Sequence, residues 1–132
     1  MTPETIQTDA APAAIGPYSQ AVRAGGFVFT AGQVGIDPTR QQLVEGVAAQ
    51  ATQALANLAA VLEAAGTGLD RVVKTTIFLA DMADFATVNE AYAAAMQTPF
   101  PARSTVAVRG LPAGALVEIE CVALGGEARA AS

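Results

Sequence analysis

A stretch of apolar residues at helical spacing, followed at once by a β-branched run, most constrains how this chain of 132 residues can fold. Between residues 47 and 65 apolar side chains recur every three or four positions, and Gly66 follows as a C-terminal cap. These positions are Val47, Ala51, Leu55, Leu58, Leu62 and Ala65. The segment from Arg71 to Leu79 predicts a strand that is buried on much of both faces. A helix joined to such a strand is expected to cover one face of a sheet.

The other patterned segments extend this unit into an α+β fold. Asp81 or Asp84 is expected to cap a second helix, which ends before Pro99. Its apolar stripe consists of Phe85, Val88, Tyr92, Ala95 and Met96. Further strands are predicted at residues 18–24, 27–33, 103–109 and 116–124, with a Gly25-Gly26 hairpin between the first two. This order of elements predicts two helices packed on one face of one sheet.

The last predicted strand differs between its two faces. Val117, Ile119, Cys121 and Ala123 point one way, and Leu116, Glu118, Glu120, Val122 and Leu124 point the other way. Two helices can cover only one face of the sheet. A second face that mixes apolar side chains with carboxylates is typical of a surface buried against another subunit. We therefore expect a homo-oligomer with polar groups at the subunit boundary.

One glycine interrupts the second predicted strand. There Phe27, Phe29, Ala31 and Gln33 are expected on one face, and Val28, Thr30 and Gly32 on the other. Glycine weakens the interior of a strand, so Gly32 indicates either a β-bulge or the close approach of a ligand to the backbone.

Composition and missing residues exclude several classes of protein. A net charge of −5 with singly scattered basic residues argues against nucleic-acid binding, and no apolar run is long enough for a membrane span. Without histidine, no Ser–His or Cys–His pair, zinc cluster or other metal site is expected, and no glycine-rich phosphate loop occurs. We expect no cofactor. The lone Cys121 and the absence of a signal peptide favour a reducing, cytoplasmic setting. One domain is expected over residues 1–132, with a loose arm at 1–14 and a frayed tail at 125–132.

Two charged groups are the strongest candidates for chemistry. Arg103 opens a short β-branched run, and its guanidinium can hold a carboxylate through two parallel hydrogen bonds. Glu118 lies in the following strand and is a candidate general base that activates water. Together they could frame a small anionic ligand. The structural alternatives are an ion pair of Arg103 with Glu118 or Glu120, and a Glu118 carboxylate that accepts backbone hydrogen bonds.

Several motifs occur in order from Ile15 to Leu124. They are residues 15–22 (IGPYSQAV), 30–33 (TAGQ), 57–66, 73–79, 89–92 (NEAY), 101–106 (PARSTV) and 117–120 (VEIE). Together they resemble the Rid (reactive intermediate deaminase) or YjgF family. The resemblance implies a chorismate-mutase-like mixed sheet, a homotrimer whose sheets line a central barrel, and clefts between subunits. It also implies hydrolysis of 2-imino acids, or their enamine tautomers, to 2-oxo acids and ammonia, as in a 2-iminobutanoate/2-iminopropanoate deaminase.

The same resemblance assigns the site residues. It places the carboxylate-binding arginine at Arg103, the motif carboxylate at Glu118, and further contacts at Tyr18, Gly32 and Asn89. The ordinary alternatives are packing for Tyr18 and a local cap for Asn89.

Two residues depart from the family pattern and complete the predicted substrate-binding set. Thr30 stands where many members have serine, and Thr105 stands where some members carry a reactive cysteine. No thiol can therefore act at position 105.

Three other functions stay open at this point. Some family members are described as ribonucleases or translation inhibitors, although the acidic charge and the absence of histidine oppose that activity here. A trimer that binds a 2-oxo acid without catalysis is a second alternative. A deaminase dedicated to one pathway intermediate is a third.

Overall fold

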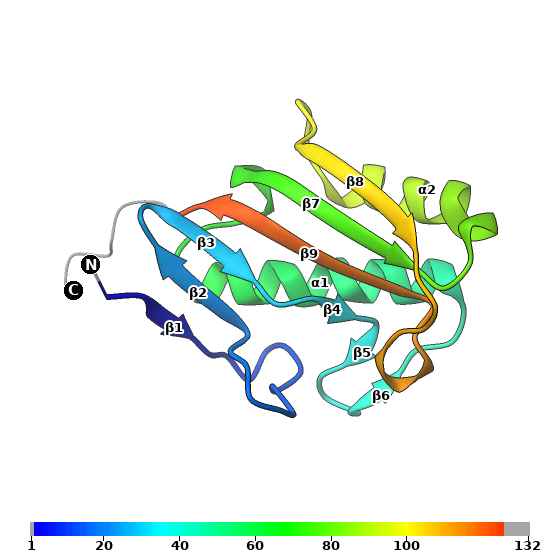
Figure 1. Cartoon of the computed structure of the whole chain (residues 1–132), viewed down its shortest axis with the longest axis horizontal. Helices are drawn as coiled ribbons and strands as arrows, with labels where there is room; N and C mark the ends of the chain where they lie inside the picture. Colours follow the sequence, from blue (N-terminus) through cyan, green and yellow to red (C-terminus); the bar gives the residue numbers. More distant parts are fainter. Residues whose placement is uncertain (1, 126–132) are drawn as a thin grey trace.

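The computed structural model describes residues 2–125, in which a mixed sheet carries two helices on one face (Figure 1). The helices are α1 (Val47–Ala64) and α2 (Phe85–Ala95). The main sheet has the order β1-β2-β3-β9-β7-β8, and β4 pairs with β9. Its strands are β1 (Glu4–Ile6), β2 (Ala21–Ala24), β3 (Phe27–Thr30), β4 (Gln33–Val34), β7 (Val72–Leu79), β8 (Ala102–Ala107) and β9 (Val117–Leu124). A separate hairpin consists of β5 (Ile36–Asp37) and β6 (Gln42–Leu43). The predicted α+β class is confirmed.

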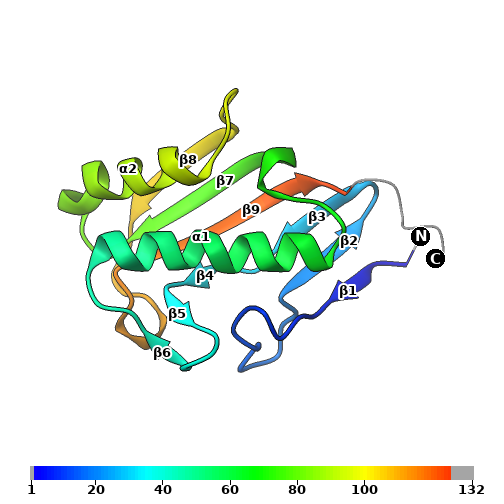
Figure 2. The same cartoon turned by 180° about the vertical axis from the view of Figure 1, so that it is seen from behind.

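Helix α1 builds most of the core, as the apolar spacing predicts. Leu55, Leu58 and Leu62 are fully buried where the helix crosses the sheet, on the side seen in Figure 2. Each such leucine contributes about 1.5–3 kcal/mol relative to an exposed side chain. Gly66 ends the helix with φ of 81°, a left-handed conformation that glycine adopts without strain. None of the described helices is both long and apolar enough to cross a bilayer.

Helix α2 connects two parallel strands, β7 and β8. Such strands need a crossover connection, and α2 supplies it. The cap predicted for this helix lies one turn earlier, because the Asp81 carboxylate accepts a hydrogen bond of 2.9 Å from Ala83 in a short 3₁₀ helix, Met82–Asp84. Asp84 occupies the N-cap of α2 but makes no side-chain cap.

The N-terminal segment differs from the loose arm expected for residues 1–14. Strand β1 pairs with β2 in antiparallel register, with Thr5 opposite Val22. The side chain of Ile6 is buried in the core, and so is that of Ala11. The segment is therefore ordered by strand pairing and by the burial of these two side chains. Its composition predicted neither feature. Of the expected tail at 125–132, all but Gly125 lies outside the described residues.

The sheet has one covered and one open face, as the β9 pattern predicts. Val117, Ile119, Cys121 and Ala123 are buried beneath the helices. The open face carries Phe27, Phe29, Ser104, Val106, Glu118, Glu120, Val122 and Leu124. Phe29 is 45% exposed and Val106 is 43% exposed. The sequence predicts that β7 is buried on much of both faces. In the single chain its helix-facing residues Thr75, Ile77 and Leu79 are buried, whereas the open face is only half-buried at Thr76 and Phe78, and Val73 is 39% exposed.

Candidate functional site

The backbone around Gly32 shifts the strand register by one residue. Phe29 pairs with Val122, but Gln33 pairs with Ile119, so three residues of the β3–β4 segment lie opposite two residues of β9. A one-residue excess of this kind is a β-bulge. Directly paired residues share a face of the sheet. Gln33 therefore lies on the covered face, and the prediction that it shares a face with Phe29 is wrong.

The bulge brings Gly32 against the carboxylate of Glu118. A Cβ added at Gly32 would lie 2.7 Å from Cδ and 2.8 Å from Oε2 of Glu118. Real Cβ atoms do not approach other atoms so closely, so only glycine leaves the carboxylate in its present position. The bulge interpretation of Gly32 is confirmed, and the group that approaches its backbone within the chain is the Glu118 side chain.

Glu118 opens into a cavity of about 580 Å³. The lining residues are Asp9, Ala11, Pro12, Ala13, Ile15, Tyr18, Gly32, Gln33, Val34, Ile36, Pro38, Gln41, Pro112, Ala113 and Glu118. The cavity thus joins three predicted site residues, Tyr18, Gly32 and Glu118. Most of the lining is apolar, with the carboxylate as a charged group, a pattern common in sites for small molecules.

Burial raises the pKa of the Glu118 carboxyl, and the like charge of Glu120 raises it further. Within the described residues the Glu118 side chain makes no hydrogen bond or ion pair. The structural alternative, a carboxylate that accepts backbone hydrogen bonds at the subunit boundary, has no counterpart within the described part of the single chain. A carboxylate with a raised pKa and free acceptor sites is suited to accept a proton from water.

Arg103 lies against the aromatic side chains of α2. Its guanidinium carbon is 5.0 Å from the ring centroid of Tyr92 and 5.5 Å from that of Phe85, both within cation–π range. The Tyr92 hydroxyl is 2.7 Å from Oγ1 of Thr75, which fixes the ring in the core. Burial raises the pKa of Tyr92, so it remains a neutral phenol beside the cation.

The guanidinium of Arg103 keeps its hydrogen-bond donors free. Among residues 2–125 it forms neither a hydrogen bond nor an ion pair. The alternative of an ion pair with Glu118 or Glu120 is wrong, because β7 separates β8 from β9. The planar guanidinium with its five N–H donors matches the geometry of an organic carboxylate.

Thr105 and Asn89 lie on the same side of the molecule as Arg103. Thr105 is two residues further along β8, and its hydroxyl is buried without a hydrogen-bond partner in the described structure. Asn89 is four residues after Phe85 on α2, which places both on one face of that helix.

The predicted residues therefore fall into two groups on opposite faces of the sheet. Arg103 pairs with Thr75, which is buried under the helices, whereas Glu118 pairs with Phe78 on the open face. A single small ligand cannot touch both groups within one chain. The arrangement places a candidate carboxylate anchor on one side and a candidate base on the other.

Thr30 has a structural partner. Its hydroxyl accepts a hydrogen bond of 3.0 Å from the backbone N–H of Cys121, across the bulge. Thr30 is absent from the cavity lining. Burial raises the pKa of the Cys121 thiol to about 11, so this cysteine is protonated at neutral pH and unreactive.

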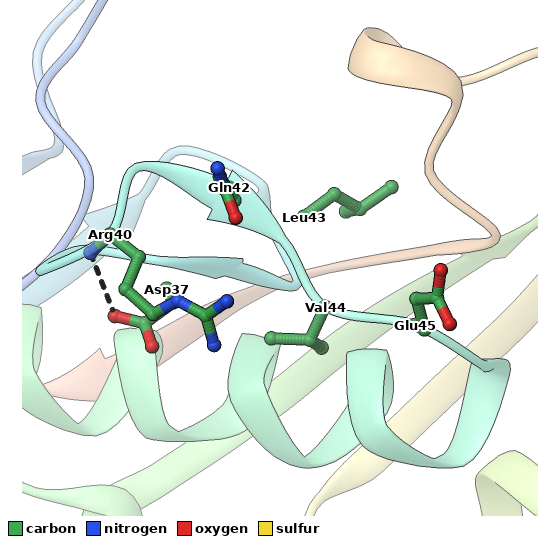
Figure 3. A pocket seen from close by; sticks show the side chains of 6 residues that line it. All are labelled: Asp37, Arg40, Gln42, Leu43, Val44 and Glu45. Atoms are coloured by element: carbon green, nitrogen blue, oxygen red, sulfur yellow. Dashed lines mark hydrogen bonds between the residues drawn. The ribbon is translucent and has the colours of Figure 1, made fainter.

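A second hollow of about 410 Å³ lies beside the β5–β6 hairpin (Figure 3). It is lined by Asp37, Arg40, Gln42, Leu43, Val44 and Glu45, and contains no predicted site residue. The Asp37 carboxylate accepts hydrogen bonds from the backbone N–H groups of Thr39 (2.9 Å) and Arg40 (3.3 Å). The Asp37 carboxylate thus stabilises the hairpin turn.

Sequence reasoning missed two buried amides that shape the cavity. Asn57 donates hydrogen bonds to the carbonyl oxygens of Val34 (3.1 Å) and Ile36 (2.9 Å), which holds the strand after the bulge. Gln20, 2% exposed, bonds to the backbone of the N-terminal segment. Both residues stand in the quoted motifs, but neither was assigned a role.

Comparisons with known proteins show the family of this chain. The family model described as Endoribonuclease L-PSP matches residues 8–125. The mouse 2-iminobutanoate/2-iminopropanoate deaminase is 52% identical over 124 residues, which are 93% of this chain and 92% of the relative.

Two solved structures share the fold. RidA from the Antarctic bacterium Psychrobacter sp. PAMC 21119 superposes with a TM-score of 0.90 at 50% identity, over 92% of this chain and 98% of that chain. TdcF of E. coli, solved with bound serine, superposes with a TM-score of 0.88 at 40% identity, over 92% of this chain and 98% of that chain. The match spans nearly the whole length of each relative, so the chain belongs to the Rid/YjgF family.

Proposed function

We propose that this protein hydrolyses reactive 2-imino acids and their enamine tautomers to 2-oxo acids and ammonia. The observation that carries the proposal is the guanidinium of Arg103, which lies against two aromatic rings, has no hydrogen-bond or ion-pair partner among residues 2–125, and is available to a carboxylate. Relatives about half identical to this chain over most of its length bear the name 2-iminobutanoate/2-iminopropanoate deaminase. No cofactor or metal is required by the residues of the site.

The chemistry needs three events, one at C3 of the enamine and two at the imine carbon C2. An enamine first takes a proton at C3 and becomes the iminium form. Glu118 then accepts a proton from water while the water oxygen attacks C2, which gives a carbinolamine. Glu118 then passes its proton to the nitrogen, and the C–N bond breaks while the carbinolamine hydroxyl gives its proton back to the Glu118 carboxylate, which releases ammonia and leaves the 2-oxo acid. Arg103 holds the substrate carboxylate, so water meets an already oriented C=N bond.

The site is completed between copies of the chain. Arg103 and Glu118 lie on opposite faces of one sheet, and both can reach one ligand only if they come from neighbouring subunits. The open face, with Phe27, Phe29 and Val106 each at least 40% exposed, supplies an apolar surface for such contact. We infer a cyclic homotrimer whose open faces meet around a central barrel, with Tyr18, Gly32 and Glu118 facing the partner's Arg103, Thr105 and Asn89.

A complementation experiment tests the shared site. Arg103→Ala and Glu118→Gln are each expected to lose imine hydrolysis, followed as 2-oxo acid formation from an imine generated in situ by a dehydratase. Co-assembled trimers of the two variants should regain activity, because random assortment rebuilds roughly one quarter of the sites from intact Arg103 and intact Glu118. Light scattering should give three times the 13.3 kDa chain mass. A monomer, or co-assembled variants that stay inactive, would refute the shared site.

The family description as an endoribonuclease suggests a second activity. The net charge of −5 and the absence of histidine oppose it, since RNA binding relies on clustered cations. Retarded RNA that is released by salt would support it. A trimer that binds a 2-oxo acid but does not accelerate ammonia release would instead be a metabolite-binding protein.

A further inference from the structure

The N-terminal segment from Asp9 to Ile15 forms one wall of the Glu118 cavity. The members of this wall are Asp9, Ala11, Pro12, Ala13 and Ile15. Four of the five are apolar, and Ile36, Pro38 and Pro112 add apolar surface from other parts of the chain. Asp9 is the charged member of this wall and lines the same cavity as Glu118. The cavity therefore presents alkyl surface together with negative charge.

Gln20 fixes this wall to the rest of the site. Its side-chain oxygen accepts a hydrogen bond of 2.7 Å from the backbone N–H of Thr8, and its amide nitrogen donates to the carbonyl oxygens of Thr8 (3.0 Å) and Pro12 (2.8 Å). Its own backbone oxygen accepts a bond of 2.8 Å from Ala31, the residue before Gly32. One residue thus holds the wall at a set distance from the Glu118 carboxylate.

We propose that residues 9–15, positioned by Gln20, select the side chain of the imino acid and favour short, uncharged alkyl groups. This inference rests on the proposed deaminase function. An apolar wall stabilises a methyl or ethyl group and leaves a polar side chain without partners. An acidic side chain would also meet the negative charges of Asp9 and Glu118. Because the part-buried hydrogen bonds of Gln20 hold Thr8 and Pro12, the wall resists displacement by a longer or branched side chain.

The size of the wall is tested with a matched pair of substitutions. Ala13 is exposed and lines the cavity, whereas Ala10 is exposed in the same segment and does not line it. Imines of alanine and leucine are generated in situ by an amino-acid oxidase with catalase, and kcat/KM is compared. Ala13→Leu should raise the ratio of kcat/KM for the alanine imine to kcat/KM for the leucine imine by about tenfold. This is the lower end of the discrimination expected for a misfit of one methylene group. Ala10→Leu should leave the ratio unchanged. Equal ratios in both variants would overturn the proposal.

The role of Gln20 is tested by removing its hydrogen bonds. Gln20→Met keeps the length of the side chain but offers no amide. Hydrogen exchange at Thr8 should accelerate, and the alanine-to-leucine ratio should fall toward one, which is opposite in direction to Ala13→Leu. Faster exchange with an unchanged ratio would show a purely structural role and refute the assignment.

The outcomes separate this inference from the proposed function. A wild-type protein that hydrolyses neither imine contradicts the deaminase function itself. A wild-type protein that is active but whose selectivity is insensitive to Ala13 contradicts only the selection by the wall. If Gln20→Met does not fold, the Ala13 and Ala10 pair still decides.

Discussion

Replacing Gly32 by alanine separates the chemistry of the site from the stability of the fold. The added methyl would lie 2.7 Å from Cδ of Glu118, and ordinary contacts begin at 3.4 Å. Gly32 has no positive φ, so alanine can adopt its backbone conformation. The strain therefore falls on the carboxylate at the end of a flexible side chain, which must move.

The required displacement sets the size of the effect. Restoring a 3.4 Å contact moves the carboxylate by about 0.7 Å, and a misplacement of about 1 Å can cost about 10²-fold in rate. We expect kcat to fall by about 10- to 100-fold if Glu118 positions water. The folded protein should hardly change, because a Gly→Ala substitution at a permitted backbone angle contributes about 0.4–1 kcal/mol of stability, enough to offset the side-chain shift.

The assay compares Gly32→Ala with Gly110→Ala. Gly110 is a matched control, because a Cβ there meets nothing within 4 Å and its φ is not positive. Formation of 2-oxo acid from an imine generated in situ gives kcat, and thermal unfolding gives Tm. Wild-type kcat in Gly32→Ala would refute the role of the Glu118 carboxylate, and a loss of Tm that matches the loss of rate would refute the separation of site from fold.

Three further predictions follow from the contacts. Because burial and the Glu120 charge raise the pKa of Glu118, activity should fall as the pH drops through a value above 4.5. Glu120→Gln should move this acidic limb of the pH–rate profile to lower pH. An unmoved limb would speak against Glu118 as the base. Tyr92→Leu should raise KM about fivefold, because about 1 kcal/mol of contact with Arg103 is lost. Tyr92→Phe keeps the ring and should keep a near-normal KM. Equal KM values in the two variants would contradict support of Arg103 by the aromatic ring. Asn57→Leu should lower the free energy of unfolding in urea by about 1–3 kcal/mol, because two backbone carbonyls lose their donor; an unchanged transition midpoint would contradict that role.

Local patterns in the sequence were sufficient for the elements and for the faces of the last strand. The spacing of Leu55, Leu58 and Leu62 predicts α1 because a helix brings residues three and four apart onto one side. Alternation in β9 correctly separated Ile119 from Glu118 because strand periodicity depends only on neighbours. Arg103 was singled out from its residue type and its place at the start of a strand.

Long-range pairing decided what those residues do. The strand order puts β7 between β8 and β9, and the register places Arg103 and Glu118 on opposite faces, so the single chain does not bring them together. The extra residue near Gly32 reverses the side on which Gln33 lies, which strict alternation cannot anticipate. Gln20 acquires its role only where distant backbone groups converge on it. Periodicity reports what neighbours along the chain share, whereas register, face and hydrogen-bond partner depend on segments that meet only after folding.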